Sequence, residues 1–152
     1  MRMRLALVGL AALVLVPAAL GWSGRPSTPP PKAPNPGGPP PAWIETQSTS
    51  AWLAFGSYCW TTAGVGACVD MIPPQSRPDL PVFRVARGRT VRVHLGFAAK
   101  SASVNVGGRV VRARLAVNRR VLSWSATRGG ILTVFARPSA GDASYVARLR
   151  LG

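Results

Sequence analysis

Residues 101–115 read SASVNVGGRVVRARL, and this stretch decides the fold. Apolar side chains at 102, 104 and 106 alternate with polar ones, which is the two-residue period of a strand with one buried face. Gly107-Gly108 favours the tight primed turn of a hairpin. The expected cross-strand pairs are Val106 with Arg109, Val104 with Val111, and Ala102 with Ala113, with Leu115 on the same face. Ser103, Asn105, Arg112 and Arg114 then share the opposite face.

The remainder of 42–152 shows the same β-rich pattern and no helical period. Short runs broken by Gly, Pro and Asn predict an all-β domain, a small antiparallel sandwich (immunoglobulin-like) or barrel. Asp142 and Tyr145 lie in a turn motif typical of a late immunoglobulin strand, where a Tyr hydroxyl closes onto nearby backbone. The expected strands are 52–55, 57–60, 67–71, 82–86, 90–97, 101–106, 109–117, 121–125, 131–136 and 144–151.

The first 21 residues indicate export. Arg2 and Arg4 precede an unbroken apolar run over 5–16, and Pro17 and small residues follow it. This order is typical of a secretory signal, with cleavage expected after Gly21. The alternative is an uncleaved membrane anchor, because the run extended to Trp22 covers 18 residues, which is close to the length that spans a bilayer. Either form places the following domain outside the cytoplasmic membrane.

Residues 22–41 predict a Pro-rich disordered linker. Nine of residues 26–41 are proline, which fixes φ and removes backbone donors. An extended polyproline II stalk or spacer is expected. A docking ligand for proline-binding modules is the alternative.

Cys59 and Cys68 are the only cysteines in the chain. An even count in an exported protein predicts one disulfide, here closing a hairpin around Gly64 and Gly66. The nine-residue separation differs from the C-x-x-C spacing of redox and zinc sites. We therefore expect a structural bond and no metal or other cofactor.

Charge is the most unusual property of the composition. Nineteen Lys and Arg oppose four Asp and Glu, for a net charge of +15 over 152 residues. Guanidinium groups on one sheet face can hold phosphate or carboxylate in bidentate fashion. A compositional origin in a GC-rich genome is the alternative, since Arg far outnumbers Lys. The candidate anion-binding residues are Arg92, Arg112, Arg114, Arg148 and Arg150.

Catalysis is not expected. The four acidic residues share no short motif, and a hydrolytic site would need a pocket joining His94 to Asp70, Asp79 or Asp142. We expect His94 to be an ordinary surface histidine. No sequence-specific nucleic-acid motif is present. The domain tryptophans are expected in the core, least securely Trp60, and a stacking platform is the alternative. These four are Trp43, Trp52, Trp60 and Trp124.

One resemblance extends over most of 52–151. The segments GSYCW at 56–60, CVD at 68–70 and Pro73-Pro74, with GDASY at 141–145, resemble a group of uncharacterised exported proteins of GC-rich bacteria. The resemblance implies export and a single domain, and it assigns no activity.

The sequence therefore predicts a non-catalytic structural or interaction module, secreted or held at the outer face of the cytoplasmic membrane. The partner is left open, with an envelope component as one possibility and membrane contact through the N-terminal segment if it stays uncleaved. The alternative function is binding of an anionic polymer or of lipid headgroups through an arginine-rich sheet face.

Overall fold

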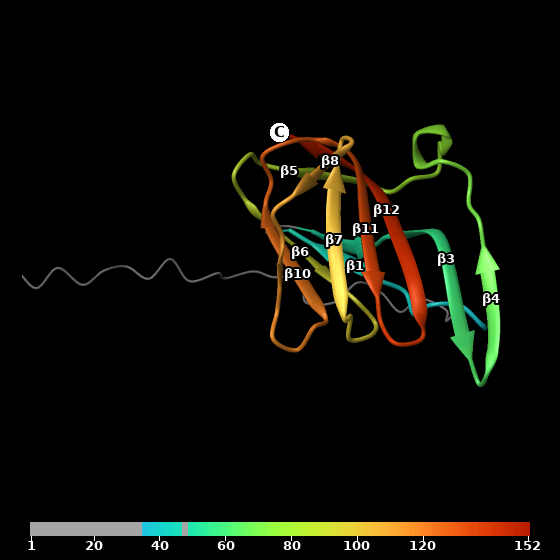
Figure 1. Ribbon diagram of the computed structural model, residues 1–152. Coiled ribbons are helices and arrows are strands. Elements are labelled where there is room, and N and C mark those ends of the chain that lie inside the picture. Colours follow the sequence, from blue (N-terminus) through green and yellow to red (C-terminus); the bar gives the residue numbers. More distant parts are fainter. Residues whose placement is uncertain (1–34, 47–48) are drawn as a thin grey trace, which may run out of the picture.

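The computed structural model describes residues 35–46 and 49–152, and the expected leader and most of the expected linker lie outside these residues. The described part is built from twelve strands and one short 3-10 helix, η1 at Pro74–Ser76. Figure 1 shows the strands packed as two layers. The strands are β1 (Trp43–Glu45), β2 (Ser50–Trp52), β3 (Ala54–Thr62), β4 (Val65–Val69), β5 (Val82–Val85), β6 (Thr90–His94), β7 (Ser101–Val106), β8 (Arg109–Val111), β9 (Arg114–Leu115), β10 (Val121–Ser125), β11 (Gly130–Arg137) and β12 (Gly141–Leu151).

The strands form two sheets that do not close into a barrel. Sheet A has the order β2-β1-β6-β10-β9, and sheet B has the order β4-β3-β12-β11-β7-β8. All pairs along these paths are antiparallel, which confirms the all-β prediction and is consistent with a sandwich. One pair differs from the antiparallel expectation, because β5 runs parallel to the end of β12.

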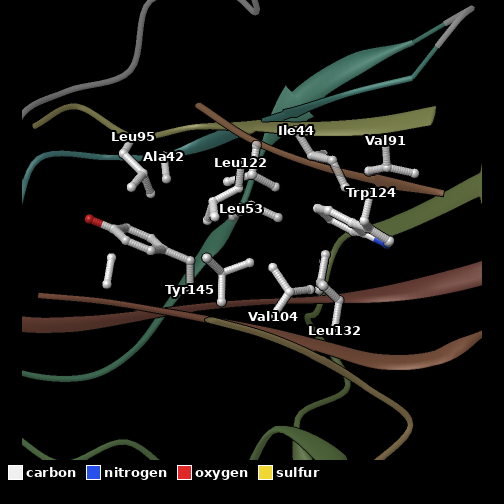
Figure 2. Packing of buried hydrophobic residues seen from close by; sticks show 14 of the residues in the cluster. Ala42, Ile44, Leu53, Val91, Leu95, Val104, Leu122, Trp124, Leu132 and Tyr145 are labelled. Atoms are coloured by element: carbon white, nitrogen blue, oxygen red, sulfur yellow. The ribbon is translucent and has the colours of Figure 1, made fainter. Parts of the chain in front are cut away.

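The core lies between the two sheets. Figure 2 shows Leu122 and Trp124 of sheet A opposite Val104 and Leu132 of sheet B. All four are at most 5 % exposed, as period-two alternation requires of the inward positions. Both sheets therefore depend on one shared apolar layer.

The hairpin at Gly107-Gly108 is confirmed, but its second strand is shorter than expected. Val106 pairs with Arg109 and Val104 with Val111, and both turn glycines have positive φ. The expected pair of Ala102 with Ala113 does not form, because β8 ends at Val111.

The expected strand over 109–117 in fact changes sheets. Arg114 pairs with Ser123 of β10, so β9 belongs to sheet A while β8 belongs to sheet B. Val111, Ala113 and Leu115 all pack against the core through this corner. The alternation of inward residues is therefore kept while the outward residues move to a different face of the molecule.

The hairpin of β3 and β4 carries the predicted disulfide. Cys59 and Cys68 are direct cross-strand partners and are bonded to each other. The turn uses Ala63 and Gly64, both with positive φ, while Gly66 lies inside β4. In Figure 1 this hairpin extends to one side of the molecule, where β4 forms the edge of sheet B.

The end of the proline-rich stretch packs onto the domain. Pro39 is fully buried, and the hydroxyl of Tyr145 donates a 2.6 Å hydrogen bond to the Pro40 carbonyl. Burial among apolar neighbours raises the pKa of Tyr145. The turn motif suggested that the Tyr hydroxyl bonds to nearby backbone. Instead, it bonds to a backbone carbonyl 105 residues earlier in the chain. Residues 39–40 belong to the folded body, although their composition places them in the linker.

Candidate anion-binding face

The outer side of sheet A brings three of the predicted arginines together. Ser123 of β10 is the cross-strand partner of Arg92 on one side and of Arg114 on the other. Its neighbours along the strand, Leu122 and Trp124, point inward to the core. Ser123 and its two partners therefore point outward, with the Arg92 and Arg114 backbones about 10 Å apart across two strand spacings.

A hollow of about 530 Å³ lies on this face over β6, β9 and β10. Two guanidinium side chains and three hydroxyl side chains line it. The lining residues are Thr90, Arg112, Ala113, Arg114, Ser123, Trp124 and Ser125. Donors of both kinds converge here on one open space, which is the arrangement that binds oxygen-rich anions.

Arg112 and Arg114 are available to a ligand. Both side chains are exposed, and neither takes part in an ion pair among residues 35–46 and 49–152. Arginine keeps its charge at every physiological pH, so both positive charges face solvent. The corner between β8 and β9 directs the two arginines to the hollow, because it moves them away from sheet B.

The third arginine is held beside a buried carboxylate. Glu45 lies opposite Arg92 on β1, and its side chain is only 6 % exposed. His94 Nε2 lies 2.9 Å from Glu45 Oε2, and Arg92 Nη1 lies 3.9 Å from Oε1. The imidazole also stacks on Trp43, with ring centroids 3.7 Å apart and planes almost parallel. Glu45 thus offsets the charge of Arg92, whereas Arg112 and Arg114 have no ion-pair partner among the described residues.

The structure does not place all five candidate arginines on one face. Arg148 and Arg150 lie on β12, where they pair with Val82 and Arg84 of β5. Arg150 and Arg84 line a separate hollow of about 670 Å³ near β2. The five arginines therefore do not form the single face that alternation predicted. Alternation places each of them outward, but they belong to opposite layers of the sandwich.

The expectation for two tryptophans was wrong, and the expectation for His94 missed its partner. His94 points outward as predicted but is bound to Glu45, a carboxylate that the sequence did not connect with it. Trp43 and Trp52 are half-exposed on the outer side of sheet A, not in the core. Trp60, the least secure expectation, is buried at 8 % exposure against Phe97. One signal in the sequence was available. Trp43 and Glu45 are two positions apart, and residues two apart in a strand point to the same face of the sheet.

Comparison with protein-family models, curated proteins and solved structures finds no match for this chain. The resemblance to exported proteins with the GSYCW and CVD segments therefore stays a prediction. In the described ranges, no helix has the length and apolar character needed to cross a bilayer. Those same ranges hold no group of three or more metal-ligating side chains.

Proposed function

We propose that this domain is an exported, non-catalytic binding module that holds an acidic polymer on the outer face of sheet A. The observation that carries the proposal is the hollow where Arg112 and Arg114, both without an acidic partner in the described chain, face the hydroxyls of Ser123 and Ser125. The ligand is a polymer that carries a phosphate or carboxylate group on its repeating units.

The shape of the site favours a polymer over a membrane surface. A hollow between side chains admits one segment of a flexible chain, whereas a bilayer offers a broad plane of headgroups. Guanidinium groups bind each acidic group in bidentate fashion, and the hydroxyls add neutral hydrogen bonds. The large positive charge of the chain would steer a polyanion to the protein over longer range.

Export is the second part of the proposal. The apolar leader supports it, and so does the Cys59–Cys68 disulfide, a bond that persists in oxidising compartments. We further propose an immunoglobulin-like form of the sandwich, which is supported by two largely antiparallel sheets that face each other across one core. An envelope location would bring the domain into contact with acidic surface polymers.

The test is a binding titration of the oxidised full-length chain with two probes, long-chain polyphosphate and polygalacturonate. Arg112→Gln combined with Arg114→Gln should weaken binding of the preferred probe by at least about tenfold, since each charge-assisted contact contributes roughly 1 kcal/mol. Arg148→Gln combined with Arg150→Gln is the matched control, because it removes the same charge from sheet B.

The control pair should weaken binding far less, and added salt should weaken it in every variant. Equal losses in the two double variants would mean that net charge alone acts, and the site would be rejected. Failure of both probes to bind the wild type at low salt would also reject it. Vesicles rich in phosphatidylglycerol form a third arm. Tighter binding to these vesicles than to either polymer would contradict the polymer assignment.

A further inference from the structure

A second hollow lies on the opposite side of the molecule, on the outer face of sheet B. It has a volume of about 510 Å³ and lies over β3, β7, β11 and β12. Its lining combines one aromatic ring with one cationic, one anionic and several hydroxyl side chains. The lining residues are Ser57, Ser101, Ala102, Ser103, Phe135, Ala136, Arg137, Asp142, Ala143 and Ser144.

Phe135 stands clear of the sheet surface. It is 52 % exposed and is the only aromatic among the exposed large hydrophobic residues of the described chain. Its two cross-strand partners are Ser103 on β7 and Ser144 on β12. Because serine is short, neither neighbour covers the ring. An unshielded aromatic ring in the middle of a sheet is costly to leave in water and is a common feature of binding surfaces.

Polar groups with free bonding capacity surround the ring. The side chains of Arg137, Ser101 and Ser103 make no hydrogen bond or ion pair to the described residues. Asp142 uses Oδ1 to accept a weak 3.4 Å bond from the Cys59 amide. Its other oxygen is available, so the rim offers a carboxylate acceptor, a guanidinium donor and hydroxyls that can do either.

Two hydroxyls at the floor are already committed. Ser57 Oγ donates to Asp70 Oδ1 at 2.7 Å, and Ser144 Oγ donates to the Ser57 carbonyl at 2.8 Å. These bonds fix the floor of the hollow and hold a second carboxylate, Asp70, beside it. Asp142 is thus the acidic residue that lines the hollow, and Asp70 is bonded to its lining residue Ser57. Asp142 offsets the charge of Arg137 on the same rim, whereas no carboxylate lines the hollow of sheet A.

We infer that the Phe135 hollow binds a neutral sugar ring. A pyranose presents apolar C–H groups on its faces and hydroxyls around its edge. Phe135 matches the faces, while Arg137, Asp142 and the serines match the hydroxyls. Carboxylate and guanidinium groups each form paired hydrogen bonds to adjacent hydroxyls, and neither requires a charged ligand.

An oligosaccharide fits better than a single ring. Phe135 also borders two smaller hollows on the same face, of about 260 and 350 Å³. One extends toward Ile72 and Pro73, and the other extends toward Asn105 and Gly107. A chain of sugar units can therefore continue to both sides of the ring that stacks on Phe135.

The experiment is an amide chemical-shift titration of the isotope-labelled, oxidised full-length chain. The probes are cellotetraose, maltotetraose and mannotetraose, each raised to about 10 mM. At least one should give saturable shifts that centre on Ser103, Phe135 and Ser144. Saturation with no probe, or shifts centred on another surface, would overturn the inference.

Substitutions at Phe135 separate sugar stacking from simple apolar contact. Phe135→Tyr keeps the flat ring and should keep binding. Phe135→Leu keeps apolar bulk but loses the ring face, and should weaken binding by about tenfold. Unchanged sugar affinity in the Leu variant would show that the ring face of Phe135 does not hold the sugar, and it would overturn the stacking assignment. Both variants change an exposed side chain, so folding should survive.

The rim is tested with a matched pair of serines. Ser103→Ala should weaken sugar binding, whereas Ser125→Ala, on the outer face of sheet A, should leave it unchanged. The double variant at Arg112 and Arg114 should also leave sugar binding unchanged. In the wild-type chain, sugar binding without polymer binding, or the reverse, therefore shows which of the two assignments has failed.

Discussion

The two sheets share one core, but the hollows on their outer faces differ in the charge of their lining side chains. On sheet A, Arg112 and Arg114 border a hollow, and the only carboxylate of that face, Glu45, is buried against His94. On sheet B, Asp142 and the exposed Phe135 border the hollow. A chain with a net charge of +15 is therefore not uniformly basic. The difference teaches that the side chains around each hollow distinguish the two faces, since sheet B also carries Arg137, Arg148 and Arg150, so one sandwich can offer two kinds of ligand surface.

The largest expected effect is a loss of folding stability that affects both faces together. Leu122→Ala on sheet A and Leu132→Ala on sheet B each remove a fully buried side chain from the shared core. Each should lower the free energy of unfolding by about 3 kcal/mol, through lost burial and the cavity that remains. Urea denaturation measures this. A large loss for one variant beside almost none for the other would show that the sheets do not share a core.

Removal of the disulfide should act on sheet B alone. Replacing Cys59 and Cys68 with serine opens a loop of about ten residues and should cost about 2.7 kcal/mol by loop-closure entropy. The hairpin lies beside the Phe135 hollow, so sugar binding should weaken while polymer binding at Arg112 and Arg114 is kept. Thermal unfolding and the two titrations measure this. Equal weakening of both ligands in folded protein would contradict the independence of the faces.

Glu45→Gln should sharpen the contrast between the faces. The change removes the negative charge beside Arg92 and His94 while keeping the shape of the side chain. Stability should fall by about 1 kcal/mol, because charge-assisted contacts become neutral ones. Polymer affinity should rise severalfold, since Arg92 then adds its full charge to the face. A lower affinity in the folded variant would show that Glu45 positions the arginine for binding.

The smallest expected effect is a pH dependence of folding stability, which comes from an ion pair near the sheet B face. The Arg77 guanidinium donates two hydrogen bonds to Asp79 and holds the pKa of that carboxyl below its usual value. A lowered folded-state pKa stabilises the fold above the unfolded value of about 3.9, and this contribution is lost as the pH falls through the folded pKa. Asp79→Asn should therefore flatten the acid side of the stability curve slightly.

The exposure of Asp79 keeps that effect small, whereas Arg77 itself is buried and also donates to the Phe55 carbonyl at 2.6 Å. Arg77→Gln should consequently destabilise the domain more than Asp79→Asn at neutral pH. Melting temperatures between pH 2 and 7 measure both. A curve for Asp79→Asn as steep as that of the wild type would show that this pair contributes nothing.

Local pattern predicted much of the fold. The turn at Gly107-Gly108 and the register of Val104 with Val111 follow from alternation and from the φ that glycine allows. The expected strand at 131–136 also forms, as part of β11, and it lies between β7 and β12. The exposure of Phe135 could not be predicted in this way, because an apolar residue in a central strand need not be covered.

The sequence by itself determined most of the strands, many of the inward residues, the disulfide and the excess of arginine, because each follows from neighbours within about ten positions or from composition. Only the tertiary structure decided which sheet each outward side chain faces. The chain crosses between layers at Arg112 and Ala113, and the partners Glu45 and His94 are 49 residues apart. Alternation shows whether a side chain points into the core or toward solvent. It does not show whether the strand belongs to sheet A or to sheet B, and so on which outer face a solvent-facing side chain lies.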